Sequence, residues 1–452
     1  MQLEDAMKIK YGTMSGLCAL LLAVQVGSAG AQDAAPQTLF TNVHVFDGVN
    51  EARIENANVL IEGNLIQTIS TDPIETDGAT VIDGGGRTLM PGLIDTHTHL
   101  SIVTAPLAAI LSSDPSYITV RSVRDAEEML MRGVTTVRDM GGNIFGLKRA
   151  IDENVVPGPR VYPAGRFITQ TSGHFDFRRP NDTNRTFSGI QPKLDRLEYA
   201  FMVDGVPQLL SATRENLRLG ASQIKIAAGG GYASPADPLL SNQYTFEEMK
   251  AVADAASDFG TYVTAHVYHP EAVNRAIDAG IKDVGHGQLL DRATLERMAA
   301  EGVHLSTQPF TVCSEPQLDA FSNAKLAEVC AGTARVYQMS KEIPDLVVTW
   351  GTDLFNVSAD DAAGQVKQLE RLLEWFEPVE ILKQATGNAT SLFAMSGDMN
   401  PYPEGPIGRI EAGAYADMLL VDGNPLEDLG AVTDSDNIRI IMKDGVIYKD
   451  TL

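Results

Sequence analysis

Between residues 91 and 405, short apolar segments alternate with segments that have the pattern of amphipathic helices. The strand-like "ASQIKIAA" precedes the helical "TFEEMKAVADAASDFG", and "YVTAHV" precedes "HPEAVNRAIDAG". Strand–helix alternation at this spacing predicts a parallel sheet covered by helices. The number of residues over which it continues suits an α/β fold of the (β/α)8 TIM-barrel type with insertions.

Both ends of the chain have a different pattern. Residues 32–90 and 406–452 contain short segments such as "TLFTNVHVFDG" and "NIRIIMKDGVIYKD", in which apolar and polar residues alternate and which break at Gly, Asn and Asp. This pattern is typical of strands joined by tight turns. We therefore expect a small β-sandwich domain that is formed by both termini.

Residues 1–31 have the pattern of a secretory signal peptide. Lys8 and Lys10 precede the apolar stretch "SGLCALLLAVQVGSAGA", which ends in small residues. A positive segment, an apolar segment and a small-residue end predict cleavage, here after Ala31, and a secreted or periplasmic protein. No later segment is long and apolar enough to predict a membrane span.

Two cysteines, Cys313 and Cys330, follow the predicted cleavage site. In an oxidising compartment they are expected to form one disulfide, and two separate thiols are the alternative.

The chain is acidic, with a formal net charge of −24 from 59 acidic and 35 basic residues. Nucleic acids and anionic membranes require a basic surface, so neither is an expected partner. A small molecule is the expected partner, and the acidic excess itself indicates chiefly solubility.

Residue types that bind metals stand at the ends of the strand-like segments of the central region. They are His97, His99, Lys225, His266, His286 and Asp353. In a barrel, the C-terminal ends of the strands form the face that carries the reactive groups. Residues two apart on a strand point to the same side, so His97 and His99 are placed to bind one ion together.

This ordered set, His-x-His, Lys, His, His and Asp, resembles that of the amidohydrolase superfamily. The motifs "MPGLIDTHTHL" and "GTD" and the "IKI" stretch around the lysine are most similar to the imidazolonepropionase-related and prolidase-like branch, which includes Xaa-Pro dipeptidases and ochratoxinase-like amidases. The resemblance covers nearly the whole chain after residue 31. It also implies that homo-oligomers are possible.

The resemblance implies two divalent metal ions, usually zinc, with a carbamylated Lys225 as the bridging ligand. His97, His99 and Asp353 would bind the first metal, and His266 and His286 the second. Imidazole and carboxylate groups suit Zn²⁺, and two close metals can share a water and lower its pKa. The resulting hydroxide would attack a carbonyl while Asp353, the catalytic residue, transfers a proton to the leaving nitrogen.

Three further residues are candidates for substrate binding. Tyr232, in "AAGGGYASPADP", could donate a hydrogen bond to a substrate carboxylate, as a tyrosine of this loop does in prolidase-like relatives. His174 lies in the loop after the third strand, which faces the barrel mouth, and His269 lies three residues after His266.

Three functions remain open on these grounds. The first is hydrolysis of an amide or peptide bond in dipeptides or N-acyl amino acids, including ochratoxin-type amides. The second is hydrolysis of a cyclic, imidazolone-type amide, against which the signal peptide and Lys225 both count. The third is a non-catalytic scaffold, which the complete set of ligand positions disfavours.

Overall fold

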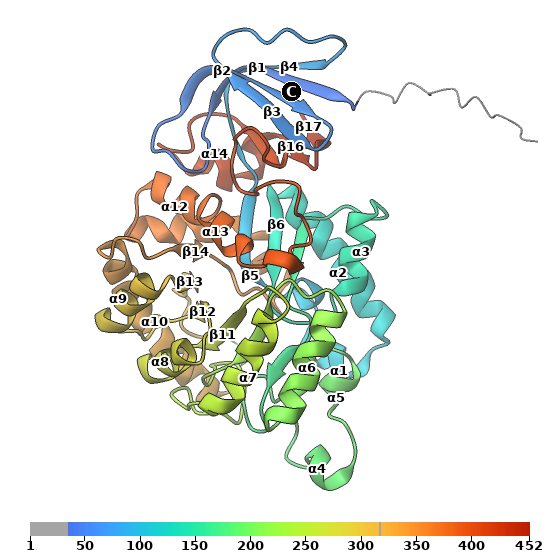
Figure 1. Ribbon diagram of the computed structural model, residues 1–452, viewed down its shortest axis with the longest axis vertical. Helices are drawn as coiled ribbons and strands as arrows, with labels where there is room; N and C mark the ends of the chain where they lie inside the picture. The colour runs from blue at the N-terminus through green and yellow to red at the C-terminus, as the bar shows by residue number, and fades with distance from the viewer. Residues whose placement is uncertain (1–34, 316–317) are drawn as a thin grey trace, which may run out of the picture. The chain divides into compact units, whose positions relative to one another are not determined.

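The computed structural model describes residues 35–315 and 318–452, and Pro36–Leu452 form one compact unit. Its parallel strands lie in two groups surrounded by helices, below a separate sheet (Figure 1). The predicted signal peptide at residues 1–31 lies outside the described residues. Over the described residues, no helix is both long and apolar enough to cross a membrane.

The larger group of parallel strands is a seven-stranded sheet. In spatial order its strands are β14 (Val348–Trp350), β13 (His304–Thr307), β12 (Asp283–His286), β11 (Val263–Val267), β10 (Ile224–Ala227), β8 (Phe167–Thr169) and β9 (Ala200–Met202). The smaller group is a three-stranded parallel sheet of β5 (Leu93–Thr98), β6 (Val134–Asp139) and β7 (Arg160–Pro163).

The two parallel sheets face a common interior. A parallel bridge joins Thr98 at the end of β5 to Leu354, just after β14. Arg138 of β6 forms an ion pair of 2.9 Å with Asp283 of β12, and neither side chain is exposed. The arrangement is therefore TIM-barrel-like, as the alternation of strands and helices predicts, with the strand ends of both sheets on one side.

Helices follow most of the parallel strands. They are α1 (Leu107–Ser112), α2 (Pro115–Met131), α3 (Phe145–Asp152), α4 (Arg185–Ser188), α5 (Lys193–Arg196), α6 (Val206–Arg218), α7 (Phe246–Ser257), α8 (Pro270–Asp278), α9 (Arg292–Glu301), α10 (Ala320–Lys341), α11 (Ala359–Ala363), α12 (Pro378–Gln384) and α13 (Asn388–Ala394). Short 3₁₀ helices are η1 (Leu100–Ile102), η2 (Val366–Glu374) and η3 (Gly397–Met399).

Local sequence signals explain where these helices begin. Asp114 precedes α2 and accepts a hydrogen bond from the Ser116 amide. Thr245 and Glu248 form a reciprocal capping box at the start of α7. Such side chains satisfy amide groups that have no partner within the helix.

Strands from both ends of the chain join in one seven-stranded sheet. Its order is β17 (Val446–Asp450), β16 (Ile438–Lys443), β15 (Met418–Val421), β4 (Thr80–Pro91), β1 (Gln37–Val45), β2 (Ile54–Glu62) and β3 (Leu65–Ser70). The helix α14 (Gly430–Thr433) and the 3₁₀ helix η4 (Ser435–Asn437) precede β16.

The prediction of a β-sandwich needs correction on this point. The long strand β4 pairs with β1 along one part and with β15 along another, so it joins the N-terminal and C-terminal strands into a continuous sheet instead of two stacked sheets. Phe40 of β1 and Leu420 of β15 nevertheless share one apolar core, so this sheet curves around its own side chains.

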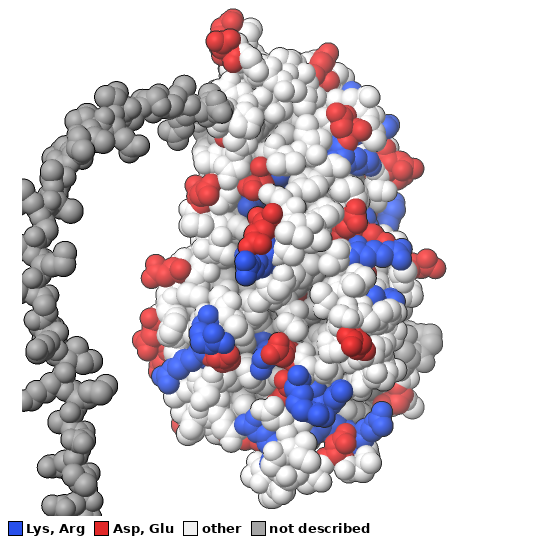
Figure 2. Space-filling model, turned by 90° about the vertical axis from the view of Figure 1, so that its right-hand side faces the viewer, with Lys and Arg blue, Asp and Glu red and all other residues white. Residues whose placement is uncertain are grey.

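Charged residues of both signs are interspersed on the face in Figure 2, with no extended basic surface. Cys313 and Cys330 are both free thiols, so the expected disulfide is not present in the structure. Each sulfur instead contacts a backbone carbonyl: Cys313 that of Thr311 at 3.5 Å and Cys330 that of Val312 at 3.4 Å.

Candidate active site

The six predicted ligand residues come from the ends of five strands. His97 belongs to β5 and His99 follows it, Lys225 lies in β10, His266 in β11, His286 ends β12, and Asp353 follows β14. All six line one small cavity. The structure therefore brings together residues that are up to 256 positions apart in the sequence.

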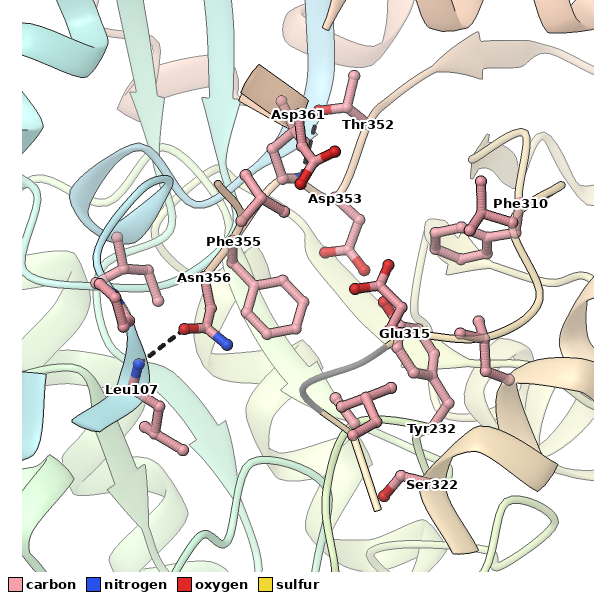
Figure 3. A pocket seen from close by; sticks show the side chains of 18 of the residues that line it. Leu107, Tyr232, Phe310, Glu315, Ser322, Thr352, Asp353, Phe355, Asn356 and Asp361 are labelled. Atoms are coloured by element: carbon pink, nitrogen blue, oxygen red, sulfur yellow. Dashed lines mark hydrogen bonds between the residues drawn. The ribbon is translucent and has the colours of Figure 1, made fainter. Parts of the chain in front are cut away.

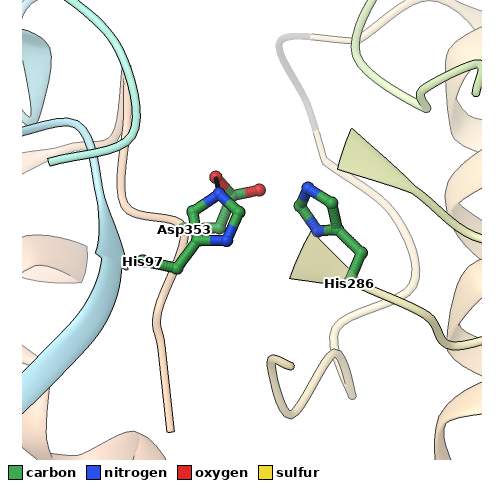
Figure 4. Close-up of side chains that lie close together, drawn as sticks. All are labelled: His97, His286 and Asp353. Carbon is green, nitrogen blue, oxygen red and sulfur yellow. Dashed lines mark ion pairs between the residues drawn. The ribbon is translucent and has the colours of Figure 1, made fainter. Parts of the chain in front are cut away.

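His97, His286 and Asp353 form the closest cluster. One potential ligand atom of each lies within 4.8 Å of the others (Figure 4). Oδ1 of Asp353 is 3.3 Å from Nε2 of His97 and 3.4 Å from Nε2 of His99. The ring centroids of His266 and His286 are 4.3 Å apart, and that of His286 is 4.7 Å from that of His97, so the two pairs of histidines are adjacent.

Hydrogen bonds to backbone carbonyls occupy one ring nitrogen of His99 and one of His266, and leave the other nitrogen of each ring free to bind a metal. Nδ1 of His99 donates to the carbonyl of Gly141 at 2.9 Å, which leaves Nε2 as an acceptor. Nε2 of His266 donates to the carbonyl of Gly230 at 3.3 Å, which leaves Nδ1. Fixing the tautomer in this way is typical of histidines that bind metals.

Burial keeps most of these imidazoles neutral. It lowers the pKa of His97, His266 and His286 well below the ordinary range, and the nearby Lys225 charge contributes in each case. For His99, burial opposes protonation, but the hydrogen bond and charge of Asp353 outweigh it and raise the pKa. Neutral imidazole is the form that binds a metal ion.

Lys225 is the most unusual member of the set. Its side chain is 1 % exposed, and Nζ has no hydrogen-bond partner among the described residues. Burial lowers its pKa to about 7, although the charges of Asp353 and Asp283 act in the opposite direction. Burying an amine without a hydrogen-bond partner costs free energy. A modification that turns the amine into a metal ligand would remove this cost.

The backbone is strained at two of the site residues. His286 has a φ of 90° and Asp353 a φ of 55°, values that non-glycine residues adopt only at a cost in free energy. Strain of this kind is concentrated at functional sites, where surrounding structure holds it in place.

A larger cavity of about 980 Å³ adjoins the small one. Asp353, Tyr232 and Phe355 line both cavities, and Asp353, Tyr232 and Glu315 lie around the same space in Figure 3. Besides Tyr232, its lining includes five aromatic side chains: Phe175, Phe177, Tyr199, Phe310 and Phe355. A cavity of this size and character can hold a ligand larger than a simple dipeptide.

His174 and Tyr232 both lie where the sequence predicts substrate-binding residues. His174 lines the small cavity, and its ring stacks on that of His266 at 3.7 Å and 12°. Its Nδ1 is bonded to the Ser234 hydroxyl at 2.8 Å. Tyr232 packs edge-on against Phe310 at 5.7 Å.

His269 is not brought into the site. Among the described residues, it lines neither cavity, and Nε2 is bonded to Asn242 Oδ1 at 3.1 Å. It precedes α8 as its N-cap residue. The chain has already turned away from the strand direction at this position, which explains why closeness to His266 in sequence does not place it in the cavity.

Gln308 and Tyr268 are two polar residues of the site that were absent from the sequence-based set. Gln308, one residue beyond β13, contacts Nδ1 of both His97 and His286, at 3.1 and 2.8 Å. Tyr268 lines the small cavity two residues after His266. The two-residue spacing of Tyr268 from His266 is a signal from which it could have been predicted, whereas Gln308 carries no motif that marks it.

Comparisons with known proteins identify the family of the chain. Residues 88–448 match the Amidohydrolase family. The chain is 28 % identical to ochratoxinase of Aspergillus niger over 376 residues, which is 80 % of this chain and 75 % of the relative.

Two solved structures extend the likeness. One is a prolidase complexed with N-methylphosphonate-L-proline, with a TM-score of 0.83, 32 % identity, and coverage of 92 % of this chain and all of that one (100 %). The other is a Xaa-Pro dipeptidase with bound methionine, with a TM-score of 0.78, 26 % identity, and coverage of 91 % and 100 %. The chain belongs to the amidohydrolase family, in its prolidase and ochratoxinase branch, and is a hydrolase that acts on carbon–nitrogen bonds.

Proposed function

We propose that this protein is a two-metal hydrolase that cleaves the amide or peptide bond of dipeptides or N-acyl amino acids, including ochratoxin-type amides. The observation that carries the proposal is the position of Lys225. Its amine is buried and unpartnered among the described residues, in the same cavity as the four histidines predicted as ligands and Asp353. A cyclic amide hydrolase with one metal would have no need of a lysine here.

The residues present fit two divalent ions, most suitably zinc. His97, His99 and Asp353 would hold one ion, His266 and His286 the other, and Lys225, as its carbamate, would lie between them. CO₂ adds to an amine in its uncharged form. The lowered pKa of Lys225 increases the uncharged fraction at neutral pH and so supports this modification. When bound, the two ions would supply a Lewis acid and a water of lowered pKa.

The protein's own groups orient the histidine rings and transfer the proton. The carbonyls of Gly141 and Gly230 hold the His99 and His266 rings in the orientation that presents a lone pair to the site. Asp353 lies against both cavities, so its carboxylate can hold a proton and pass it to the leaving nitrogen. His174 supports the ring of His266 by stacking on it.

The residues that line the large cavity support a substrate that has an apolar acyl group and a free carboxylate. Phe175, Phe177 and Phe355 supply apolar surface near Asp353. Tyr232 is placed at the junction of the two cavities, where its hydroxyl can donate a hydrogen bond to the substrate carboxylate.

Hydrolysis of a defined panel by purified, zinc-loaded protein tests this proposal. The panel contains dipeptides, N-acyl amino acids and aromatic amides, each with a matched C-terminal amide that lacks the free carboxylate. Release of amino acids from the carboxylate forms, detected by mass spectrometry, is expected, with weaker cleavage of the matched amides. Cleavage of cyclic amides alone would contradict the proposal.

The N-terminal sequence supports a secreted or periplasmic location. Residues 1–31 have the three parts of a cleaved signal peptide. The mature protein is then expected to begin at Gln32, which the intact mass of exported protein measures. Assembly into homo-oligomers stays a prediction from the family.

A further inference from the structure

The β10 loop (residues 229–238) is built around the amine of a buried lysine, Lys325 of α10. The side chain of Lys325 is 5 % exposed. Its Nζ donates hydrogen bonds to three backbone carbonyls of the loop, those of Gly231 at 2.7 Å, Ser234 at 2.6 Å and Asp237 at 3.0 Å. An ammonium group has three N–H donors, so the charged lysine satisfies all three acceptors and leaves no donor unused.

Asp237 closes the same loop from within. Its side chain is fully buried, and Oδ2 accepts a hydrogen bond from the Gly231 amide at 2.7 Å, while Oδ1 lies 3.9 Å from Nζ of Lys325. A buried charge costs free energy unless hydrogen bonds and an opposite charge compensate for it, and Lys325 has both. The lysine and the β10 loop therefore hold each other in place.

The β10 loop carries residues of the active site. Tyr232, which follows Gly231 in the sequence, lines both cavities. The Ser234 hydroxyl is bonded to Nδ1 of His174, and a Cβ atom at position 231 would be 1.9 Å from that nitrogen. The loop is thus packed tightly against the site, and a shift of its backbone would displace Tyr232.

The helix that carries Lys325 also lines the large cavity, through Ser322 and Leu326. Ser322 and Tyr232 lie around the same space in Figure 3. Residues three apart on a helix lie on one face, so Lys325 and Ser322 point to the same side of α10. Lys325 therefore connects one wall of the large cavity with the loop that carries Tyr232.

We propose that Lys325 is a positioning residue, which fixes Tyr232 at the junction of the two cavities and thereby sets a preference for substrates with a free carboxylate. This inference rests on the proposed function, in which the Tyr232 hydroxyl donates to that carboxylate. Lys325 is not one of the described residues that line the two cavities, and it acts through the loop. Without the amine, three carbonyls would lose their donor, so the loop would change conformation.

Lys325→Met tests the inference, because methionine has a similar length and no N–H donor. The quantity to measure is the preference ratio, which is kcat/KM for an N-acyl amino acid divided by kcat/KM for its matched C-terminal amide. The ratio should fall about 10-fold to 100-fold, as for the loss of a hydrogen bond to a charged group. Lys325→Gln keeps two N–H donors on a shorter side chain and should give an intermediate ratio, which decides the question if Lys325→Met does not fold.

A double mutant identifies the residue through which Lys325 acts. Tyr232→Phe should lower the preference ratio by itself, and adding Lys325→Met should change the ratio further by less than about 3-fold, because both substitutions remove the same interaction. Lys443→Met is the matched control, since Lys443 is also a buried lysine, 4 % exposed, but belongs to β16 of the terminal sheet. Its loss should lower the thermal midpoint and leave the preference ratio at the wild-type value.

Hydrogen exchange gives a measurement that does not depend on turnover. In Lys325→Met, the amides of the β10 loop should exchange at least about 10-fold faster, whereas those of α7 should keep the wild-type rate. A wild-type preference ratio in the mutant, unchanged exchange of the loop, or equal cleavage of both substrates by the wild type would overturn the role of Lys325. If the wild type cleaves neither substrate, the proposed function has failed, and the exchange rates still decide whether Lys325 holds the loop.

Discussion

The backbone of Gly285 lies directly against the amine of Lys225. A Cβ atom added at position 285 would be 3.0 Å from Nζ of Lys225 and 3.2 Å from Cε1 of His97. The one glycine of β12 thus stands where this strand faces the two groups. The bare backbone leaves space around Nζ that the proposed carbamate of Lys225 would need.

Gly285→Ala should therefore displace Lys225 or His97 and reduce metal binding. We expect kcat to fall at least 10-fold and zinc content to fall below that of the wild type, measured by mass spectrometry of the metal. The conformation at Gly285 does not itself exclude alanine, since its φ lies outside the left-handed range. Gly146→Ala is the control, because nothing lies within 4 Å of a Cβ at that position in α3; wild-type zinc content and kcat in Gly285→Ala would show that the space is not used.

Lys225→Ala should abolish activity and at least one metal site. The substitution removes the amine that would carry the carbamate, and short carboxylic acids such as acetate should restore part of the activity by occupying its place. Lys250→Ala removes an exposed lysine paired with Asp254 and should change neither property. Full activity in Lys225→Ala without added acid would eliminate the bridging role.

Asp353→Asn should keep bound metal but lose most turnover. The amide retains an oxygen that can act as a ligand, but it cannot take a proton at the junction of the two cavities. Loss of a general base typically reduces kcat by about 10²–10⁴-fold. Steady-state kinetics at saturating zinc measure the effect, and a rate near that of the wild type would assign the proton transfer to another group.

Asp195 makes stability depend on pH. Burial raises its pKa to about 6 from 3.8, although a hydrogen bond from the Met202 amide and the charge of Arg185 oppose the shift. The folded protein keeps this proton where the unfolded chain has lost it. Stability therefore falls as pH rises from about 4 to about 6 and stays lower above that window, by at most about 3 kcal/mol.

Asp195→Asn should remove this loss of stability at neutral pH, because asparagine carries no charge. Its thermal midpoint should exceed that of the wild type at pH 8 and approach it at pH 4, when measured for both proteins in the same buffers. An equal difference at both pH values would show that the carboxyl charge is not the cause.

The sequence predicted which of the proposed ligand residues come together, because the strand ends of a parallel arrangement meet on one side. His97, Lys225 and Asp353 could be grouped by residue type and position alone, and the structure places them in one cavity. Loop residues were harder. Tyr232 and His174 lie at the cavities, whereas His269 does not, since its orientation depends on where β11 gives way to α8.

Other features depend on contacts that a sequence does not display. The continuous sheet at the termini exists because β4 is long enough to pair with both β1 and β15, and the pairing of a strand along two segments is not visible in its own pattern. Gln308 is polar at a strand end and carries no recognisable motif. Its importance follows only from its contacts with His97 and His286.

Titration of zinc into the metal-free protein, with bicarbonate present and hydrolysis of a cleaved dipeptide followed at each step, tests the central claim most directly. The account predicts that activity is absent without zinc and rises to a plateau at two equivalents per chain. A plateau at one equivalent, or equal activity of the metal-free and zinc-loaded protein, would contradict it.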